Sequence, residues 1–123
     1  MNRYPGLTLR ILARTGPAMG PGKAELLVHI DETGSISAAA RAMDMSYRRA
    51  WQLVEAMNQD FIEPLVVTET GGKRGGGATV TQFGHEVLER FRLLEARASG
   101  AIGRGLAGFD RLLRKPLKEI TRR

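Results

Sequence analysis

The stretch from Gly34 to Asn58 constrains the fold more than any other part of the chain. It begins with a short alanine-rich segment, Ser37 to Met43, and continues through a three-residue break, Asp44 to Ser46. In the segment beyond the break, apolar residues recur at helical spacing: Ala50, Leu53, Val54 and Met57. Small alanine side chains favour a helix and let a second helix cross close over it. The stretch therefore predicts a helix-turn-helix, with an ordinary helical hairpin as the alternative.

Both predicted helices carry a start signal, and the second one has a distinct polar face. Ser37 and Ser46 each precede a helical run, where a hydroxyl can accept a hydrogen bond from an unpaired amide. If the apolar residues face the core, the residues that face solvent lie mostly on the first two turns: Tyr47, Arg48, Arg49, Gln52 and Glu55. A DNA recognition helix contacts the duplex with those turns. Arginine can donate twice to guanine or clamp phosphate, glutamine can pair with adenine, and tyrosine can donate to phosphate.

Composition narrows the class of protein. The 123 residues are 42% hydrophobic, which suits one small domain. The sequence has no cysteine, which excludes disulfides, thiolate zinc sites and cysteine nucleophiles. The start has no apolar signal region, and no apolar run approaches the roughly 20 residues of a membrane span. We expect a cytoplasmic protein without membrane contact.

The net charge of +6 is distributed unevenly. From Gly100 onward, seven basic and two acidic residues give +5, which leaves +1 for residues 1–99. The overall charge is therefore a weak argument for nucleic-acid binding. Local clusters are stronger evidence, and two basic pairs stand out, Arg48 with Arg49 and Lys73 with Arg74.

Two elements are expected before the helix-turn-helix. Alternating apolar residues over Leu7 to Leu12 predict a strand, which Gly16-Pro17 would end. This strand needs a partner strand. Gly20-Pro21-Gly22 then introduces a helix that runs through about Glu32, and Gly34 suits its C-terminal cap.

A hairpin is expected after the second helix of the motif. Leu65 to Thr70 is rich in β-branched residues, a glycine-rich segment with Lys73 and Arg74 follows, and Ala78 to Thr81 returns. A hairpin directly after a helix-turn-helix is the winged-helix arrangement. Glycines let the tip approach a sugar-phosphate chain closely, while the two cations bind phosphate. The alternative is a solvated hairpin turn without a DNA contact.

Thr81 can cap a long fourth helix, which carries more apolar surface than one core requires. Four residues recur at the spacing of a coiled-coil seam: Val87, Phe91, Leu94 and Ala98. Phe83, Leu88 and Leu93 widen this surface. We expect one face to pack on the domain and another on a second subunit, with packing on the core alone as the alternative.

The residue types that catalysis needs are scarce. His29 and His85 are the only histidines, so a histidine metal site or acid-base pair is not expected. The segment Gly103 to Gly108 matches a dinucleotide-binding glycine pattern, but no strand precedes it. We predict no enzymatic activity, no cofactor and no metal.

From about Leu7 to Ala98 the chain resembles the N-terminal winged-helix domain of the molybdate-responsive ModE regulators, whose helix-turn-helix resembles the LysR type. The resemblance rests on four stretches: G-S-I-S-A-A-A, M-S-Y-R-R-A-W, E-A-M-N-Q and G-G-K-R-G-G-G-A. It implies a homodimer built through the first strand and the fourth helix, and Trp51 supporting the recognition helix. Those regulators carry C-terminal molybdate-binding domains, which nothing after Gly100 resembles.

The predicted fold is mainly α with a small β component, a winged helix-turn-helix with a long C-terminal dimerisation helix. It occupies residues 1–99, and a Gly-rich linker with a short basic amphipathic tail occupies residues 100–123. The predicted DNA contacts are Ser37, Ser46, Tyr47, Arg48, Arg49, Gln52, Lys73 and Arg74. The predicted dimer contacts are Leu9, Ile11, Val87, Phe91, Leu94 and Ala98.

The predicted function is a homodimeric, sequence-specific transcription regulator that binds a near-palindromic DNA duplex and is linked to molybdenum metabolism. A partner protein that binds an effector is a further expected interaction. The alternatives are a winged-helix module for protein-protein contact and a non-specific DNA-binding protein.

Overall fold

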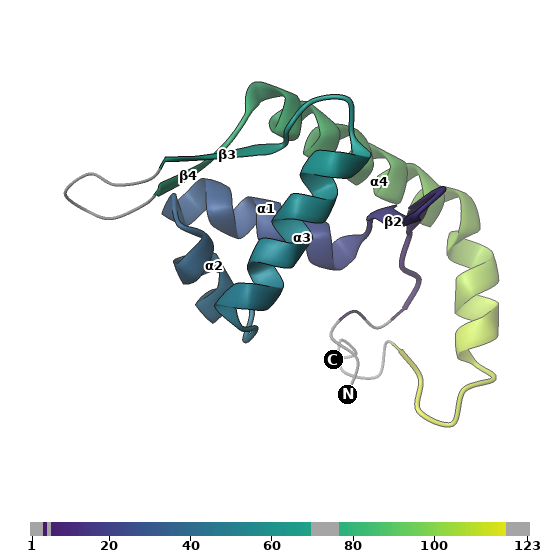
Figure 1. The fold of residues 1–123 in the computed structure, drawn as a ribbon. Helices are drawn as coiled ribbons and strands as arrows, with labels where there is room; N and C mark the ends of the chain where they lie inside the picture. The colour runs from purple at the N-terminus through teal and green to yellow at the C-terminus, as the bar shows by residue number, and fades with distance from the viewer. Residues whose placement is uncertain (1–3, 5, 70–76, 118–123) are drawn as a thin grey trace.

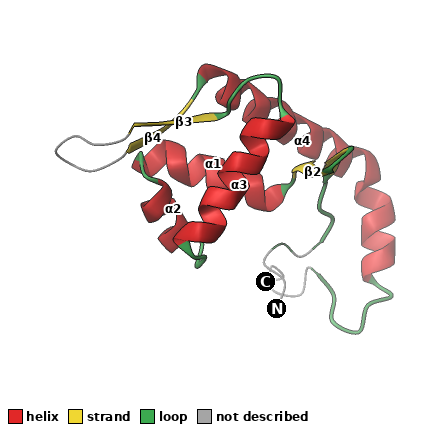
Figure 2. Cartoon of the chain, in the orientation of Figure 1, coloured by secondary structure: helices red, strands yellow, loops and turns green. Residues whose placement is uncertain are grey.

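A computed structural model describes residues 4, 6–69 and 77–117 of the chain (Figure 1). Its elements follow in the order β1 (Ile11–Ala13), β2 (Gly16–Met19), α1 (Pro21–Thr33), α2 (Ile36–Ala42), α3 (Tyr47–Asp60), β3 (Val66–Glu69), β4 (Gly77–Val80) and α4 (Gln82–Asp110). Helices dominate, and the strands form two separate two-stranded antiparallel sheets (Figure 2). The predicted fold class is confirmed: the chain is a winged helix-turn-helix with a long C-terminal helix.

The first sheet corrects the strand that we predicted over Leu7 to Leu12. Strand β1 begins only at Ile11, and its partner is β2, which starts at the Gly16-Pro17 pair that was expected to end the strand. A tight turn over residues 14–15 makes this hairpin possible, and Gly16 completes the turn with a φ of 148°. Pro17 is tolerated because a two-stranded sheet has only edge strands.

Helix α1 starts and ends where its local signals predict. Pro21 occupies the first turn, where its missing N–H has no intrahelical partner to lose. Gly34 adopts a left-handed conformation with a φ of 69°, and its N–H donates to the Ile30 carbonyl at 2.7 Å.

The start of α2 differs from the prediction, because Ser35 rather than Ser37 caps it. The Ser35 hydroxyl accepts a hydrogen bond from the Ala38 N–H at 3.0 Å. The helix begins at Ile36, two residues earlier than predicted. Ile36 is buried in the core, and burial of its apolar side chain favours this earlier start. Ser37 lies inside the helix, and its hydroxyl accepts from Arg41 Nη1 at 2.9 Å.

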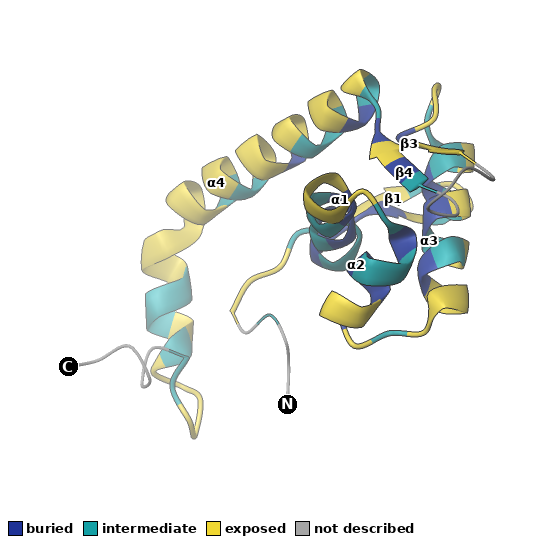
Figure 3. Cartoon of the chain, turned by 90° about the vertical axis from the view of Figure 1, so that its left-hand side faces the viewer, coloured by how far each residue is buried: buried dark blue, intermediate teal, exposed yellow. Residues whose placement is uncertain are grey.

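The core lies where α1, α2 and α3 meet the inner face of the second sheet (Figure 3). Ala39 of α2 and Ala50 of α3 are fully buried, which confirms the expectation that small side chains let these helices approach closely. Leu26, Leu27 and Ile30 of α1 fill the space beneath them.

The wing hairpin forms as predicted, although β3 begins one residue later than expected and β4 lies one residue earlier. Val66 pairs with Val80 at its base, and Glu69 pairs with Gly77 at the far end of the described part. The glycine-rich tip, including Lys73 and Arg74, lies outside the described residues.

Helix α4 is 29 residues long and extends well past the globular part of the fold (Figure 3). Thr81 caps it as predicted, since the Thr81 hydroxyl accepts from the Gly84 N–H at 2.8 Å. The linker predicted from Gly100 onward is corrected, because the helix continues through four glycines to Asp110. Each glycine costs a helix only about 1 kcal/mol relative to alanine, and the first proline after the start of α4 is Pro116.

Candidate nucleic-acid interface

The turn between α2 and α3 fixes where the recognition helix begins. Asp44 takes a left-handed conformation with a φ of 56°, which aspartate tolerates better than most residues. The Met45 N–H donates to the Ala40 carbonyl at 3.0 Å and closes the turn. Ser46 then caps α3 as predicted, its hydroxyl accepting from the Arg49 N–H at 3.0 Å. The first turn of α3 is thus held by local hydrogen bonds.

The polar face of α3 points to solvent, as its periodicity predicts. The exposed residues on α3 include Tyr47, Arg48, Arg49, Gln52 and Glu55. On the opposite side, Ala50, Val54 and Met57 are buried, and Leu53 is half-buried. The helix therefore presents its N-terminal polar side chains outward while its apolar face packs against the core.

Tyr47 and Trp51 form a contact pair on this surface. Their ring centroids lie 6.4 Å apart with an interplanar angle of 81°, an edge-to-face arrangement. Trp51 Nε1 donates to the Tyr47 hydroxyl oxygen. The half-buried indole holds the exposed phenol in place, and the phenol O–H can still donate to an external acceptor.

Arg48 and Arg49 have no ion-pair partner among the residues that the structure describes. The contrast with α4 is clear, since Arg90 pairs with Glu86 at 3.0 Å and Arg92 pairs with Glu95 at 3.0 Å. Each of the two exposed α3 guanidinium groups carries five N–H donors.

Lys23 adds a third basic group that the sequence did not reveal. It lies in α1, and its Nζ donates to the Pro17 carbonyl at 2.5 Å. Burial lowers the pKa of Lys23, the carboxylate of Asp60 acts in the opposite direction, and the charge of Arg49 lowers it further. Strand β2 contacts both α1 and α3, and this tertiary packing brings the lysine near the recognition helix.

The two serines predicted to contact DNA already accept hydrogen bonds within the protein. Ser46 is exposed and its oxygen caps α3, while Ser37 is half-buried in α2 and its oxygen accepts from Arg41. A hydroxyl can still donate its proton in both cases.

Hydrogen bonds attach each strand of the wing, in its described part, to the helix-turn-helix. On one strand, the Asn58 side chain makes hydrogen bonds to the backbone of Leu65 and Val66. On the other, the Ala78 N–H donates to the Gly34 carbonyl at 2.9 Å. Sequence reasoning missed the role of Asn58, although it belongs to the E-A-M-N-Q stretch of the resemblance.

Gly84 is a second residue whose role appears only in the structure. A Cβ at this position would lie 2.3 Å from the Leu65 carbonyl oxygen and 2.9 Å from Val80 Cγ1. The first turn of α4 can therefore pack against the wing base only with glycine here. The Thr81 N–H donates to the same Leu65 carbonyl at 2.9 Å.

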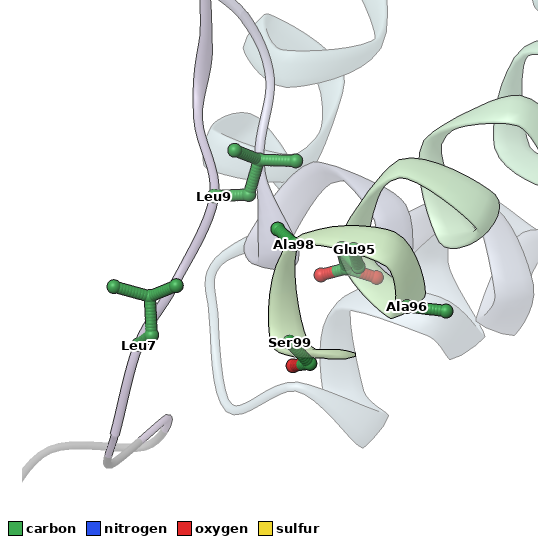
Figure 4. Close-up of a pocket in the computed structure, with 6 residues that line it drawn as sticks. All are labelled: Leu7, Leu9, Glu95, Ala96, Ala98 and Ser99. Carbon is green, nitrogen blue, oxygen red and sulfur yellow. The ribbon is translucent and has the colours of Figure 1, made fainter. Parts of the chain in front are cut away.

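The residues predicted to form a dimer interface divide between core and surface. Phe91 is only 2% exposed in the core of its own chain, and half-buried Val87 packs against that core, as the core-packing alternative expected. Leu94 and Ile11 are exposed, at 45% and 39%. Leu9 and Ala98 face each other across a groove of about 290 Å³ between the N-terminal segment and α4 (Figure 4).

The two histidines each lie beside carboxylates. His29 Nε2 is 3.4 Å from Glu25, and His85 Nε2 is 2.9 Å from Asp31. In the described parts of the chain, no three potential metal ligands lie together. Across the same ranges, no helix combines the length and apolar content that a bilayer crossing requires.

Comparisons with known proteins agree with this geometry. A family model described as "Bacterial regulatory helix-turn-helix protein, lysR family" matches residues 22–85. The chain is 39% identical over 112 residues to the molybdenum-pterin-binding protein MopB of Rhodobacter capsulatus, covering 91% of this chain and 40% of MopB. It is 37% identical over 118 residues to the molybdenum transport protein ModE of Azotobacter vinelandii, covering 91% of this chain and 41% of that protein.

A third relative carries a regulatory name. The chain is 42% identical over 74 residues to the DNA-binding transcriptional dual regulator ModE of Escherichia coli K12, covering 60% of this chain and 28% of that protein. The resemblance to ModE regulators is thus confirmed, and the chain spans about two-fifths or less of the length of these three relatives. Their names describe regulators and binding or transport proteins, not enzymes.

A solved structure has the same fold. The crystal structure of the CbnR DBD–DNA complex matches with a TM-score of 0.54 and 23% identity, covering 71% of this chain and 94% of that chain. Its low identity makes this a likeness of fold alone. The helix-turn-helix, the wing that follows it and the match over residues 22–85 lead to one conclusion: the chain belongs to the lysR family of bacterial regulatory helix-turn-helix proteins.

Proposed function

We propose that this chain binds double-stranded DNA through α3 and the wing and regulates transcription. The observation that carries the proposal is the pair Arg48 and Arg49, exposed and without ion-pair partners among the described residues, on the first turn of a capped helix. A recognition helix uses this turn to contact base edges and phosphates. The name of the Escherichia coli relative and the DNA-bound structure of the same fold support the proposal.

Each predicted contact residue has a chemical role in this proposal. Arg48 and Arg49 donate to guanine or phosphate, and Gln52 pairs with adenine. Tyr47, held by Trp51, donates to phosphate, as do the hydroxyls of Ser37 and Ser46. Lys73 and Arg74 in the wing neutralise phosphates and release counterions, which makes affinity fall with salt.

The proposal includes a homodimer that binds a near-palindromic duplex. Leu94 and Leu93 of α4 remain exposed at 45% and 50% after the core is filled. Exposed leucines on consecutive positions of a long helix favour association with a second copy. A two-fold dimer presents two equivalent recognition helices, so its operator has matching two-fold symmetry.

The regulated process in this proposal is molybdenum metabolism. The names of the relatives MopB and ModE support this link. No cofactor is assigned to the chain, and an effector reaches it through a partner protein. We place the protein in the cytoplasm, where the duplex DNA of a bacterium lies.

Fluorescence anisotropy with labelled duplexes selected from random genomic fragments tests the proposal. The wild-type chain should prefer the selected duplex over a scrambled one, and the paired change Arg48→Ala with Arg49→Ala should remove that preference. Arg104→Ala is the matched control, because Arg104 is an exposed arginine on the distal part of α4. Equal affinity for all duplexes would support the non-specific alternative, and no binding would support the protein-protein module.

A further inference from the structure

We propose that Asn58 is the positioning residue that sets the wing relative to the recognition helix, so that both reach the same stretch of duplex. This inference rests on the proposed function. Asn58 lies in the last turns of α3, and the wing strand β3 begins eight residues later at Val66. The segment between α3 and β3 includes the exposed residues Ile62, Glu63 and Pro64.

The Asn58 side chain uses both ends of its amide. Its Oδ1 accepts from the Leu65 N–H at 2.8 Å and from the Val66 N–H at 3.2 Å. Its Nδ2 donates to the Val66 carbonyl at 2.9 Å. The three bonds fix the orientation of the amide, because the N–H groups of Leu65 and Val66 face its oxygen and the Val66 carbonyl faces its nitrogen. A carboxylate could satisfy only the two donors.

Apolar packing and hydrogen bonds contribute differently to the position of the wing. Val66 and Val80 bury the inner face of the hairpin, while Val67 points to solvent. Apolar burial is non-directional and holds the hairpin on the core. Hydrogen bonds are directional, and the Asn58 amide links β3 to α3 itself.

The second strand has its own attachment, to a different element. The Ala78 N–H of β4 donates to the Gly34 carbonyl at the end of α1. The hairpin is therefore held at the recognition helix through β3 and at the entrance of the helix-turn-helix through β4. Of these two attachments, the one at β3 is made by a side chain, that of Asn58, and a substitution can therefore remove it. The one at β4 joins two backbone groups.

Replacing Asn58 should affect the wing before it affects the recognition helix. Asn58→Ala leaves the N–H groups of Leu65 and Val66, both buried residues, without their partner. The other end of α3 keeps its Ser46 cap and the buried anchors Ala50 and Val54. Base discrimination by α3 should therefore persist while the phosphate contacts of the wing weaken.

The salt dependence of DNA affinity is the measurement that separates these contributions. The slope of log affinity against log salt concentration is negative, and each phosphate contact makes it steeper by about 0.9. Asn58→Ala should make this slope shallower by about 1 to 2, as should the paired change Lys73→Ala with Arg74→Ala. The ratio of affinities for operator and scrambled duplex, measured at low salt, should stay within about twofold of wild type.

A double-mutant cycle gives the second readout. If Asn58 acts through the wing, Asn58→Ala should change affinity less than about twofold in a chain that already lacks Lys73 and Arg74. A purely structural effect would lower affinity by the same factor in both backgrounds. Gln59→Ala is the matched control, because Gln59 is the exposed neighbour of Asn58 on the same helix and should leave the slope unchanged.

Asn58→Asp keeps the test valid if Asn58→Ala fails to fold. The carboxylate retains acceptors for Leu65 and Val66 and places an oxygen against the Val66 carbonyl, so its slope should fall between those of Asn58→Ala and wild type. A wild-type slope in these variants, or equal effects in both backgrounds of the cycle, would overturn the inference alone. Failure of the wild-type chain to bind DNA would overturn the proposed function and this inference with it.

Discussion

The helix-turn-helix with its wing base and the distal half of α4 use similar residues in opposite ways. In the first region, Leu27, Ile30 and Leu65 are fully buried. In the second, Ile102 and Phe109 expose 36% and 59% of their surface, and Leu112, just beyond the end of the helix, exposes 78%. Burial therefore depends on whether other elements cover a face, and the distal part of α4 has few neighbours (Figure 1).

Glycine shows the same contrast. Gly84 stands where α4 touches the wing base, and a Cβ there would collide with backbone. Gly103, Gly105 and Gly108 lie in the distal half, and a Cβ at each would meet nothing within 4 Å. The same residue type is therefore required by packing in one region and only weakens the helix in the other.

The largest effect expected from this comparison is that of Gly84→Ala. The added methyl must push against the Leu65 carbonyl oxygen at 2.3 Å, so unfolding free energy should drop by about 3 kcal/mol or more. Urea denaturation followed by circular dichroism measures it. Wild-type stability in this variant would mean that α4 does not lie this close to the wing base.

The next effect concerns DNA affinity. Arg48→Ala or Arg49→Ala should each cost about 1–3 kcal/mol against a selected operator if the side chain makes a bidentate base contact. Lys73→Ala should instead weaken all duplexes alike. Anisotropy titrations with operator and scrambled duplex check both, and operator affinity unchanged in both arginine variants would exclude α3 as the recognition helix.

Dimerisation tests the exposed apolar surface in the first half of α4. Leu93→Asp with Leu94→Asp should weaken self-association at least tenfold, about 1.4 kcal/mol, because charges would replace apolar surface at the contact. Sedimentation velocity at micromolar concentration measures this. Ile62→Asp makes the same kind of change at a loop residue that is 90% exposed, and it should leave association unchanged. A wild-type monomer would contradict the predicted seam.

A smaller effect of opposite sign is expected from Gly103→Ala. Alanine has the higher helix propensity and finds open space at this position, so stability should rise by about 0.5–1 kcal/mol. Thermal unfolding compared with wild type checks the sign. A loss of stability would show that the distal part of α4 packs closely against another surface.

The smallest expected effect is that of molybdate. Selective capture of a tetrahedral oxyanion needs several converging donors in a dehydrated pocket, and after Gly100 the chain has Thr121 as its only hydroxyl. Micromolar molybdate should therefore leave the DNA affinity of this chain unchanged, as should sulfate. A molybdate-specific change in an anisotropy titration would reveal an oxyanion site in this chain.

Local signals in the sequence were sufficient to predict the solvent-facing side of α3 and several helix caps. The apolar spacing of α3 predicted which side chains face solvent, and Ser46, Thr81 and Gly34 were identified as caps. These features depend on residues within about one helical turn of each other, so they are present in a short window of sequence.

Other features were decided by contacts between distant residues. Ser35 caps α2 beside the buried Ile36, and Phe91 of the predicted dimer seam is buried in the core of its own chain. The placement of Lys23 near Arg49 and the hydrogen bonds of Asn58 to β3 also depend on how helices and strands pack. The amino-acid sequence by itself determined which faces are apolar and where most helices start. The tertiary structure decided which apolar face is covered and which polar side chain joins two elements, because burial and long-range hydrogen bonds need partners that no short window contains.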